Sequence, residues 1–139
     1  MLPEKTRLIQ HPALPDPRQW DAMAHGILLK PSGSWPAFPY SDSLERRWRA
    51  LPPSMGRSPW ITEMPNAQGT RLAIADLRAS TSPFEQLTQA RKLAALIGER
   101  EPERVDLLLV GLPEGLARRG AEAVTSALLA RAPLPSFKG

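Results

Sequence analysis

The stretch VDLLLVGLPEG (residues 105–115) determines how the rest of the chain can be interpreted. Its apolar run, 107–110, is followed by two glycines four positions apart and then by a helical pattern. A short, partly β-branched run bounded by turn residues predicts a buried strand, here over 105–112. The same outline occurs where a strand leads into a loop that holds a phosphate at a helix N-terminus. The stretch is therefore either a ligand-binding turn or an architectural one.

The turn between Gly111 and Gly115 lacks the residues that phosphate sites use. A dinucleotide fingerprint needs G-x-G-x-x-G, and a P-loop ends in Gly-Lys-Ser/Thr; neither is present. Pro113 has no backbone N–H to offer a phosphate, and Glu114 would set a negative charge against that of the ligand. We therefore interpret Gly111 and Gly115 as permitting a tight strand-to-helix turn. Gly120 then lets the following helix lie close to the sheet.

The surrounding sequence predicts alternating strands and helices. Strands are expected over 59–64 and 70–77, joined as a hairpin by PNAQG. The run Ser82-Pro83-Phe84-Glu85 predicts a helix start, with a Ser cap and Pro at the first helical position, and this helix ends at Gly98. A last helix is expected over about 114–132. Strand, helix, strand, helix implies a parallel sheet with crossover connections, and hence an α/β fold.

Residues 1–65 have a different character, that of short elements joined by stiff turns. They contain 11 of the 16 prolines and all four tryptophans. Strands are expected at 6–10 and 27–30, and a short helix is expected to begin at Asp16-Pro17 and to end at Gly26. A second helix is expected from a capping box at Asp42 to the Pro52-Pro53 pair. With few long elements to bury them, the tryptophans suggest an exposed apolar contact surface.

Composition limits the function classes. The chain carries 18 Lys+Arg against 14 Asp+Glu, and each half has a net charge of +2 (8 basic and 6 acidic residues in 1–65, 10 and 8 in 66–139). This even distribution argues against a dedicated nucleic-acid module. There is no cysteine, so disulfides and zinc knuckles are excluded. No segment resembles a membrane span or a signal peptide, so we expect a cytoplasmic protein.

Four groups of residues have chemistry that a site could use, and each has an ordinary structural explanation. They are the histidines His11 and His25, the segment ERRWRA (45–50), the Ser80–Ser82 cluster and the carboxylates Glu101 and Glu103. His11 is expected in a proline-rich turn and His25 beside a helix-ending glycine; neither has a carboxylate at metal-ligand spacing on a common helix face, so we interpret them as surface or cap histidines. The arginines are expected on a solvated helix face, Ser82 as a helix cap and the glutamates in a charged turn. We therefore assign no catalytic, cofactor-binding or metal-binding residue.

Residues 70–139 resemble the N-terminal domain of the leucyl aminopeptidases, also called cytosol aminopeptidases. The resemblance lies in the order of TRLAIADL, SPFEQLTQARKLAALIG, RVDLLLVGLP and AEAVTSALLARAPLPSFKG, and the last of these matches best. The first strand lacks the Gly-Leu-Gly ending of the family, and Pro-Leu-Pro-Ser replaces its Tyr-x-Phe pattern before Phe137. Residues 1–65 match only by the order of their elements.

The resemblance implies a three-layer, macro-domain-like fold with a mixed, largely parallel sheet flanked by helices, and a single domain over 1–139. Family members carry a separate C-terminal domain that binds two divalent metal ions, zinc or manganese, and releases N-terminal amino acids from peptides. Its metal-binding segment is absent here, and 133–139 corresponds to the start of the linker. We therefore expect an excised, noncatalytic N-terminal domain that packs on its own catalytic domain and supports a homo-oligomer.

Two other functions remain open. Macro-like folds often bind nucleotides or ADP-ribose, which would require a glycine-rich loop with free N–H groups in place of GLPEG. A basic protein that contacts nucleic acid would show an affinity that falls steeply with salt. Both alternatives can be tested by titration, the first with ADP-ribose.

Overall fold

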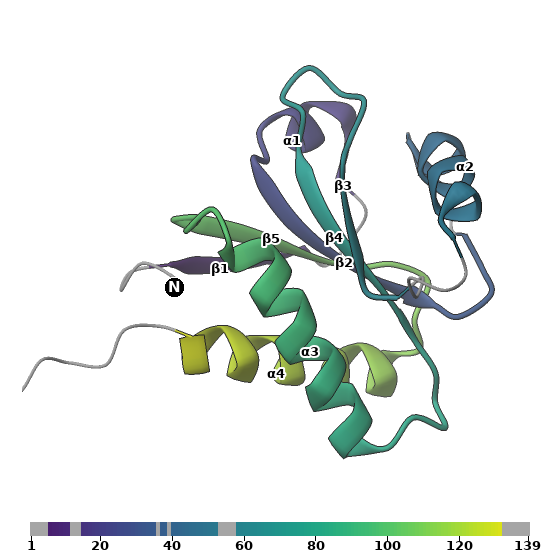
Figure 1. Ribbon diagram of the computed structural model, residues 1–139, viewed down its shortest axis with the longest axis vertical. Coiled ribbons are helices and arrows are strands. Elements are labelled where there is room, and N and C mark those ends of the chain that lie inside the picture. The colour runs from purple at the N-terminus through teal and green to yellow at the C-terminus, as the bar shows by residue number, and fades with distance from the viewer. Residues whose placement is uncertain (1–5, 12–14, 36, 39, 53–57, 132–139) are drawn as a thin grey trace, which may run out of the picture.

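A computed structural model describes residues 6–11, 15–35, 37–38, 40–52 and 58–131 of the chain. The described elements form a sheet of five strands with two helices on each face (Figure 1). In chain order they are β1 (Arg7–His11), α1 (Pro17–Asp21), β2 (His25–Pro31), α2 (Ser41–Ala50), β3 (Trp60–Glu63), β4 (Arg71–Leu77), α3 (Pro83–Gly98), β5 (Arg104–Leu109) and α4 (Glu114–Arg131). The expected three-layer α/β architecture is confirmed.

The strands are arranged in the order β1-β5-β2-β4-β3. The first four are parallel, and β3 is antiparallel to β4 at one edge. The β3–β4 hairpin predicted from PNAQG is present, and its Gly69 has a φ of +63°, a backbone conformation that glycine adopts without strain. The sheet is thus mixed and largely parallel, as expected.

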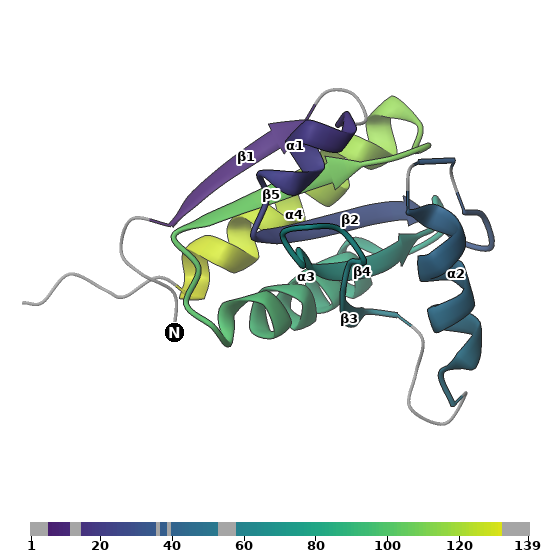
Figure 2. The same cartoon turned by 90° about the horizontal axis from the view of Figure 1, so that it is seen from above.

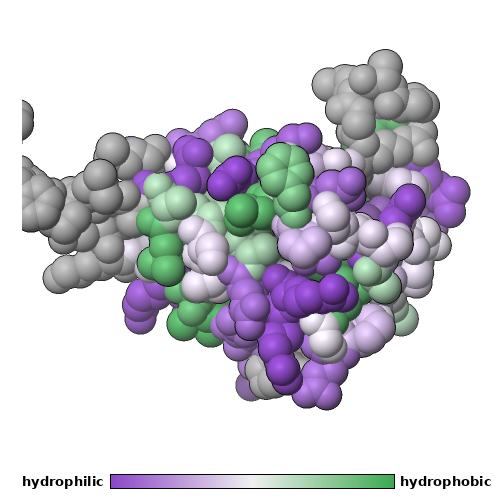
Figure 3. All heavy atoms as spheres, turned by 90° about the horizontal axis from the view of Figure 1, so that it is seen from below, coloured by the Kyte–Doolittle hydropathy of each residue, from purple (hydrophilic) through white to green (hydrophobic). Residues whose placement is uncertain are grey.

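One face of the sheet is covered by α3 and α4. Alternate residues of the parallel strands point to this face, as the two-residue period of a strand requires. Its core consists of side chains from β2, β4, β5 and the two helices, among them Ile27, Leu29, Ala73, Leu107, Leu93, Ile97, Val124 and Leu128. Seen from below, the face that carries α4 and the start of α3 shows hydrophobic residues interrupted by hydrophilic ones (Figure 3).

The other face is covered by α1, α2 and the loop between β2 and α2 (Figure 2). Trp20 of α1 is completely buried and stacks on Phe38, with 5.6 Å between the ring centroids. Trp60 is also buried, and Trp35 and Trp48 pack against the same core while partly exposed. The expectation that few elements bury the tryptophans is therefore wrong, because the proline-rich half folds these rings onto the second face of the sheet, where only Trp35 and Trp48 remain partly exposed.

The helix starts follow local rules at two places. The Asp16 side chain accepts a hydrogen bond from the Gln19 N–H and the Gln19 side chain bonds back, which makes a capping box with Pro17 at the first position. The Ser82 side chain caps α3 by accepting from the Glu85 N–H at 3.1 Å. Both starts were predicted.

Two predicted boundaries were wrong. Gly26 lies inside β2, while α1 ends at Asp21; a Cβ at position 26 would lie 3.0 Å from Leu72 Cδ1, so packing within the sheet explains this glycine. The helix α2 begins at Ser41, one residue before Asp42, and no side chain caps it. Asp42 therefore lies in the first turn, where its negative charge interacts favourably with the helix dipole although its side chain makes no capping hydrogen bond. Pro53 and the 133–139 linker lie outside the described residues.

Candidate functional site

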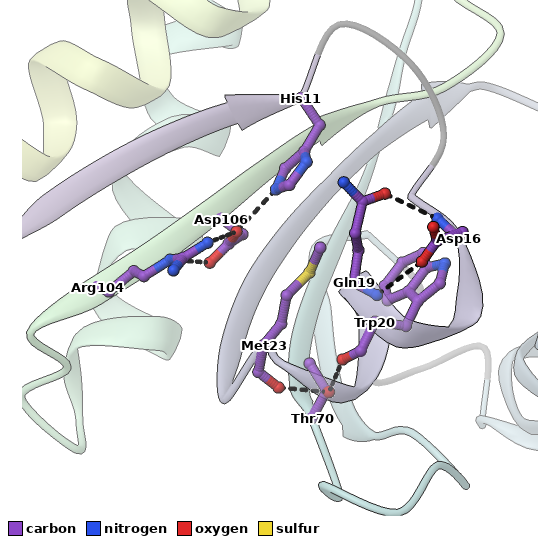
Figure 4. A network of polar contacts seen from close by, with 8 residues as sticks. All are labelled: His11, Asp16, Gln19, Trp20, Met23, Thr70, Arg104 and Asp106. Atoms are coloured by element: carbon purple, nitrogen blue, oxygen red, sulfur yellow. Dashed lines mark hydrogen bonds and ion pairs between the residues drawn. The ribbon is translucent and has the colours of Figure 1, made fainter.

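Three side chains from two neighbouring strands form an ion cluster around one buried carboxylate near an edge of the sheet (Figure 4). His11 Nε2 lies 2.7 Å from Asp106 Oδ2. The Arg104 guanidinium donates to both carboxylate oxygens, at 3.0 Å to Oδ1 and 2.9 Å to Oδ2. The Asp106 side chain is only 1% exposed. Its hydrogen bond and its negative charge raise the pKa of Arg104 above the usual value, so the guanidinium stays charged.

This cluster is explained by strand pairing. Asp106 lies opposite Ile9 of β1, and its partners come from β1 and β5. A histidine beside a carboxylate can act as a general base, but the bidentate guanidinium already neutralises this carboxylate. We therefore assign the cluster to holding the edge strand β1 against β5. The interpretation of His11 as a surface histidine was wrong, and the signal was the single acid in the apolar strand at 105–110.

A second buried pair joins β2 and β4, where Lys30 and Asp76 face each other in register. Lys30 Nζ lies 2.7 Å from Asp76 Oδ1 and donates to the Ser34 carbonyl at 3.0 Å. The ammonium also lies 4.6 Å from the centroid of the Trp35 ring and 5.9 Å from that of Trp48. Because Lys30 is 1% exposed, this charge depends entirely on these partners. The pair holds the loop that follows β2 against the sheet.

Beside Asp76, at the carboxyl end of β4, the surface forms a hollow of about 450 Å³, which we call the carboxyl-edge hollow. It is lined by Ser32, Ser58, Asp76, Arg78, Thr81, Phe84, Glu85, Thr88, Gln89 and Lys92. The chain leaves β2 toward α2 on one face and leaves β4 toward α3 on the other. Ligands of open α/β sheets bind at such a switch point, outside the carboxyl ends of the strands. This hollow is therefore the best candidate site in the part of the chain that the structure describes.

The lining of the carboxyl-edge hollow combines both signs of charge with one apolar side. Arg78 and Lys92 are cationic, Asp76 and Glu85 are anionic, and the Phe84 side chain is 75% exposed. The Arg78 Nε donates to the Ser32 hydroxyl at 3.0 Å, which connects the ends of β4 and β2 across the switch point. The sequence did not identify these residues as a group, because they come from three separate segments.

A second depression, the α4 groove, lies between α4 and the ends of β1 and β5. Its volume is about 820 Å³, and it is lined by Gln10, Leu109, Glu114, Arg118, Ala121, Glu122, Thr125 and Ser126. It borders β1, which within the described sheet pairs with β5 alone. This broad depression beside a sheet edge has a mixed polar and apolar lining and is suited to contact with another protein surface.

The glycines after β5 have the geometry that the architectural interpretation requires at two of three positions, Gly111 and Gly120. Gly111 has a φ of +71°, which a residue with a side chain rarely adopts. A Cβ at Gly120 would lie 2.7 Å from Leu77 Cδ1 and 3.0 Å from Leu29 Cδ1, so the glycine allows α4 to approach the sheet closely. Gly115 differs from the prediction: it lies in the first turn of α4 without a positive φ, and a Cβ there would meet open space. The turn therefore requires only Gly111.

His25 begins β2 and does not lie beside a helix end, which corrects the earlier placement. Its Nδ1 is buried and has no hydrogen-bond partner among the described residues. Partial burial, and then the positive charges of Arg71 and Arg100, lower the pKa of His25 below its usual value. The imidazole is therefore held in its neutral form near neutral pH.

The remaining candidates have structural roles. Arg47 of α2 donates to the Thr62 hydroxyl at 3.1 Å and to the Glu63 carbonyl, which joins α2 to β3. Ser82 caps α3. Glu101 and Glu103 are exposed in the turn before β5. The prediction of a partly apolar, partly solvated helix for ERRWRA is confirmed, because Trp48 packs on the core.

Within the described residues, no group of three or more His, Asp or Glu side chains could hold a metal ion. Among the described helices, none combines the length and the apolar character that a membrane crossing requires.

Comparisons with protein-family models, with curated proteins and with solved structures found no match.

Proposed function

We propose that this chain is the noncatalytic N-terminal domain of a leucyl (cytosol) aminopeptidase that acts in the cytoplasm. In this role the peptidase chemistry and its two divalent metal ions, zinc or manganese, belong to a separate catalytic domain. The chain packs against that domain and supports assembly of a homo-oligomer.

The observation that carries this proposal is the order and direction of the elements in the second half. The β3–β4 hairpin, α3, β5 and α4 follow each other as the resemblance implies. β4 and β5 belong to the parallel part of the sheet, and both helices cover the same face. The core buried by this half therefore belongs to a complete sheet-and-helix layer, as a separately folded domain requires.

The surface beside α4 supports a packing role. The α4 groove borders β1 at the sheet edge. Near the end of α4, the Leu129 side chain is 70% exposed. An exposed leucine on the helix that lines a depression of mixed polar and apolar surface resembles the mixed composition of contacts between domains of one chain. We place the contact with the catalytic domain on this side of the molecule.

The test begins with the complete reading frame that contains these 139 codons. The full product and the 139-residue chain are expressed, treated with chelator, and assayed for hydrolysis of L-leucine p-nitroanilide with Mn²⁺ or Zn²⁺ restored. We expect metal-dependent hydrolysis by the full product and none by the chain alone. A reading frame without a metallopeptidase segment, or hydrolysis by the 139-residue chain itself, would overturn the proposal.

The packing surface has its own test in the full product. Leu129→Glu should weaken assembly, measured by size-exclusion chromatography with light scattering. Arg91→Glu changes an exposed side chain on α3 and serves as the matched control. Equal assembly of both variants would show that the end of α4 does not form the contact.

A further inference from the structure

We propose that the carboxyl-edge hollow binds a small zwitterion, a free α-amino acid or a short peptide that carries both an ammonium and a carboxylate. The ligand's carboxylate is bound by Lys92 and Arg78, and its ammonium by Glu85 and Asp76. This inference stands on the hollow alone and does not depend on the proposed aminopeptidase role.

The first argument is the balance of charge in the lining. Two cationic and two anionic side chains converge on one hollow. A phosphate or nucleotide would meet two carboxylates there, and a metal cation would meet an arginine and a lysine. A ligand with separated charges of both signs gives Arg78, Lys92 and Glu85 opposite partners, and it adds a second partner to Asp76, which already pairs with Lys30.

The second argument is the state of the lining groups. Asp76 keeps one oxygen on Lys30, and its side chain is 17% exposed, so the carboxylate can still accept from a ligand. The state of Asp76 therefore favours a ligand that brings a donor.

The third argument concerns size and the apolar side. A hollow of about 450 Å³ is at the small end of the range of natural ligand sites. The phenyl ring of Phe84 is 75% exposed beside the charged groups. An apolar ligand side chain packed against this ring would remove apolar surface from water. Leucine and the dipeptide leucyl-leucine match these features and are suitable probes.

The experiment is a titration of the ¹⁵N-labelled 139-residue chain by NMR at low salt, with L-leucine in one arm and leucyl-leucine in the other. We expect saturable shifts of amides around the hollow, and the tighter of the two probes identifies the natural length of ligand. N-acetyl-leucine lacks the ammonium and leucinamide lacks the carboxylate. Each should bind at least about tenfold more weakly, because each loses one charge-assisted contact.

Two variants test separately the side chains proposed to bind the carboxylate and the ammonium of the ligand. Lys92→Met should weaken L-leucine about tenfold and leave leucinamide unchanged, because leucinamide has no carboxylate to lose. Glu85→Gln should weaken L-leucine but leave N-acetyl-leucine unchanged. Arg91→Met, which replaces an exposed cation of α3 that does not line the hollow, should leave all affinities unchanged.

Three results would overturn the inference. One is the absence of saturable shifts up to about 10 mM of either probe, an affinity too weak for a site. Another is equal binding of L-leucine, N-acetyl-leucine and leucinamide, which would indicate contact with Phe84 alone. The third is inorganic phosphate that binds the hollow and competes with L-leucine in the wild type and in Glu85→Gln alike, which would make it an anion site.

Discussion

Replacing Asp76 by asparagine should destabilise the fold more than replacing its partner Lys30 by methionine. The reason is an asymmetry in burial: the Lys30 side chain is 1% exposed, and that of Asp76 is 17% exposed beside the hollow. Asp76→Asn leaves a full positive charge in a buried position, where the Ser34 carbonyl at 3.0 Å compensates only in part. Lys30→Met leaves a carboxylate that water in the hollow can reach.

The size of each effect follows from these environments. Breaking a fully buried ion pair costs about 3–5 kcal/mol, and the retained hydrogen bond of asparagine reduces this, so we expect about 2–3 kcal/mol for Asp76→Asn. For Lys30→Met we expect about 1–2 kcal/mol, since the carboxylate is rehydrated and methionine preserves the packing of the lysine stem. The double variant should cost less than the sum of the two, because neither charge is then left unpaired.

Urea unfolding followed by tryptophan fluorescence measures these differences, since Trp20 and Trp60 are buried in the core. Lys92→Met, which removes an exposed lysine, is the control and should change the free energy of unfolding by less than about 0.5 kcal/mol. Additive costs in the double variant, or a larger cost for Lys30→Met than for Asp76→Asn, would refute the reasoning.

Three further predictions follow from other parts of the fold. Because the pKa of His25 is lowered in the fold, the unfolded chain binds a proton more readily, so the contribution of His25 to stability is fully present above about pH 6.5 and decreases below it. The loss of stability between pH 7.5 and 5.5, measured by urea midpoints, should be smaller in His25→Gln than in the wild type. Equal losses would contradict this assignment. Gly120→Val should lower the free energy of unfolding by about 1–3 kcal/mol through overpacking, whereas Gly115→Ala, whose Cβ meets open space, should raise it by up to about 1 kcal/mol. Thermal unfolding measures both changes. An unchanged stability of Gly120→Val would argue against the close approach of α4 to the sheet. Asp106→Asn should increase amide hydrogen exchange in β1 first, while Glu103→Gln, an exposed neighbour, should not; unchanged exchange in β1 would show that the ion cluster does not hold this edge.

Features encoded by neighbouring residues could be predicted from the sequence. Asp16-Pro17 and Ser82-Pro83 mark helix starts because a side-chain acceptor and a residue without an N–H satisfy the first turn locally. The strand predicted over 105–112 is recognised because the apolar run is short, partly β-branched and bounded by turn residues, and the structure has it as β5 (Arg104–Leu109). The helix end predicted at Gly26 was wrong, because the sequence alone does not distinguish a glycine that ends a helix from one that packs closely against Leu72 within a sheet.

The candidate site could not be predicted, because it is made by strand order. Lys30 faces Asp76 only because β2 lies beside β4, and His11 meets Asp106, 95 positions away, only because β1 pairs with β5. Apolar periodicity indicates which face of a strand is buried but not which strand is its neighbour. The wrong interpretation of the tryptophans has the same origin, since the second face of the sheet exists only once that order is known.

The carboxyl-edge hollow exists because β3 is shorter than the strand it pairs with. Its four residues reach only as far as Ile74, and the next position, Pro59, has no N–H with which to extend the ladder toward the end of β4. Instead, the Asp76 N–H donates to the Ser58 hydroxyl at 3.0 Å, so a side chain terminates this edge. Ser58 and Asp76 therefore lie side by side where the ladder ends, and both line the hollow, while the Asp76 carboxylate pairs with the buried Lys30.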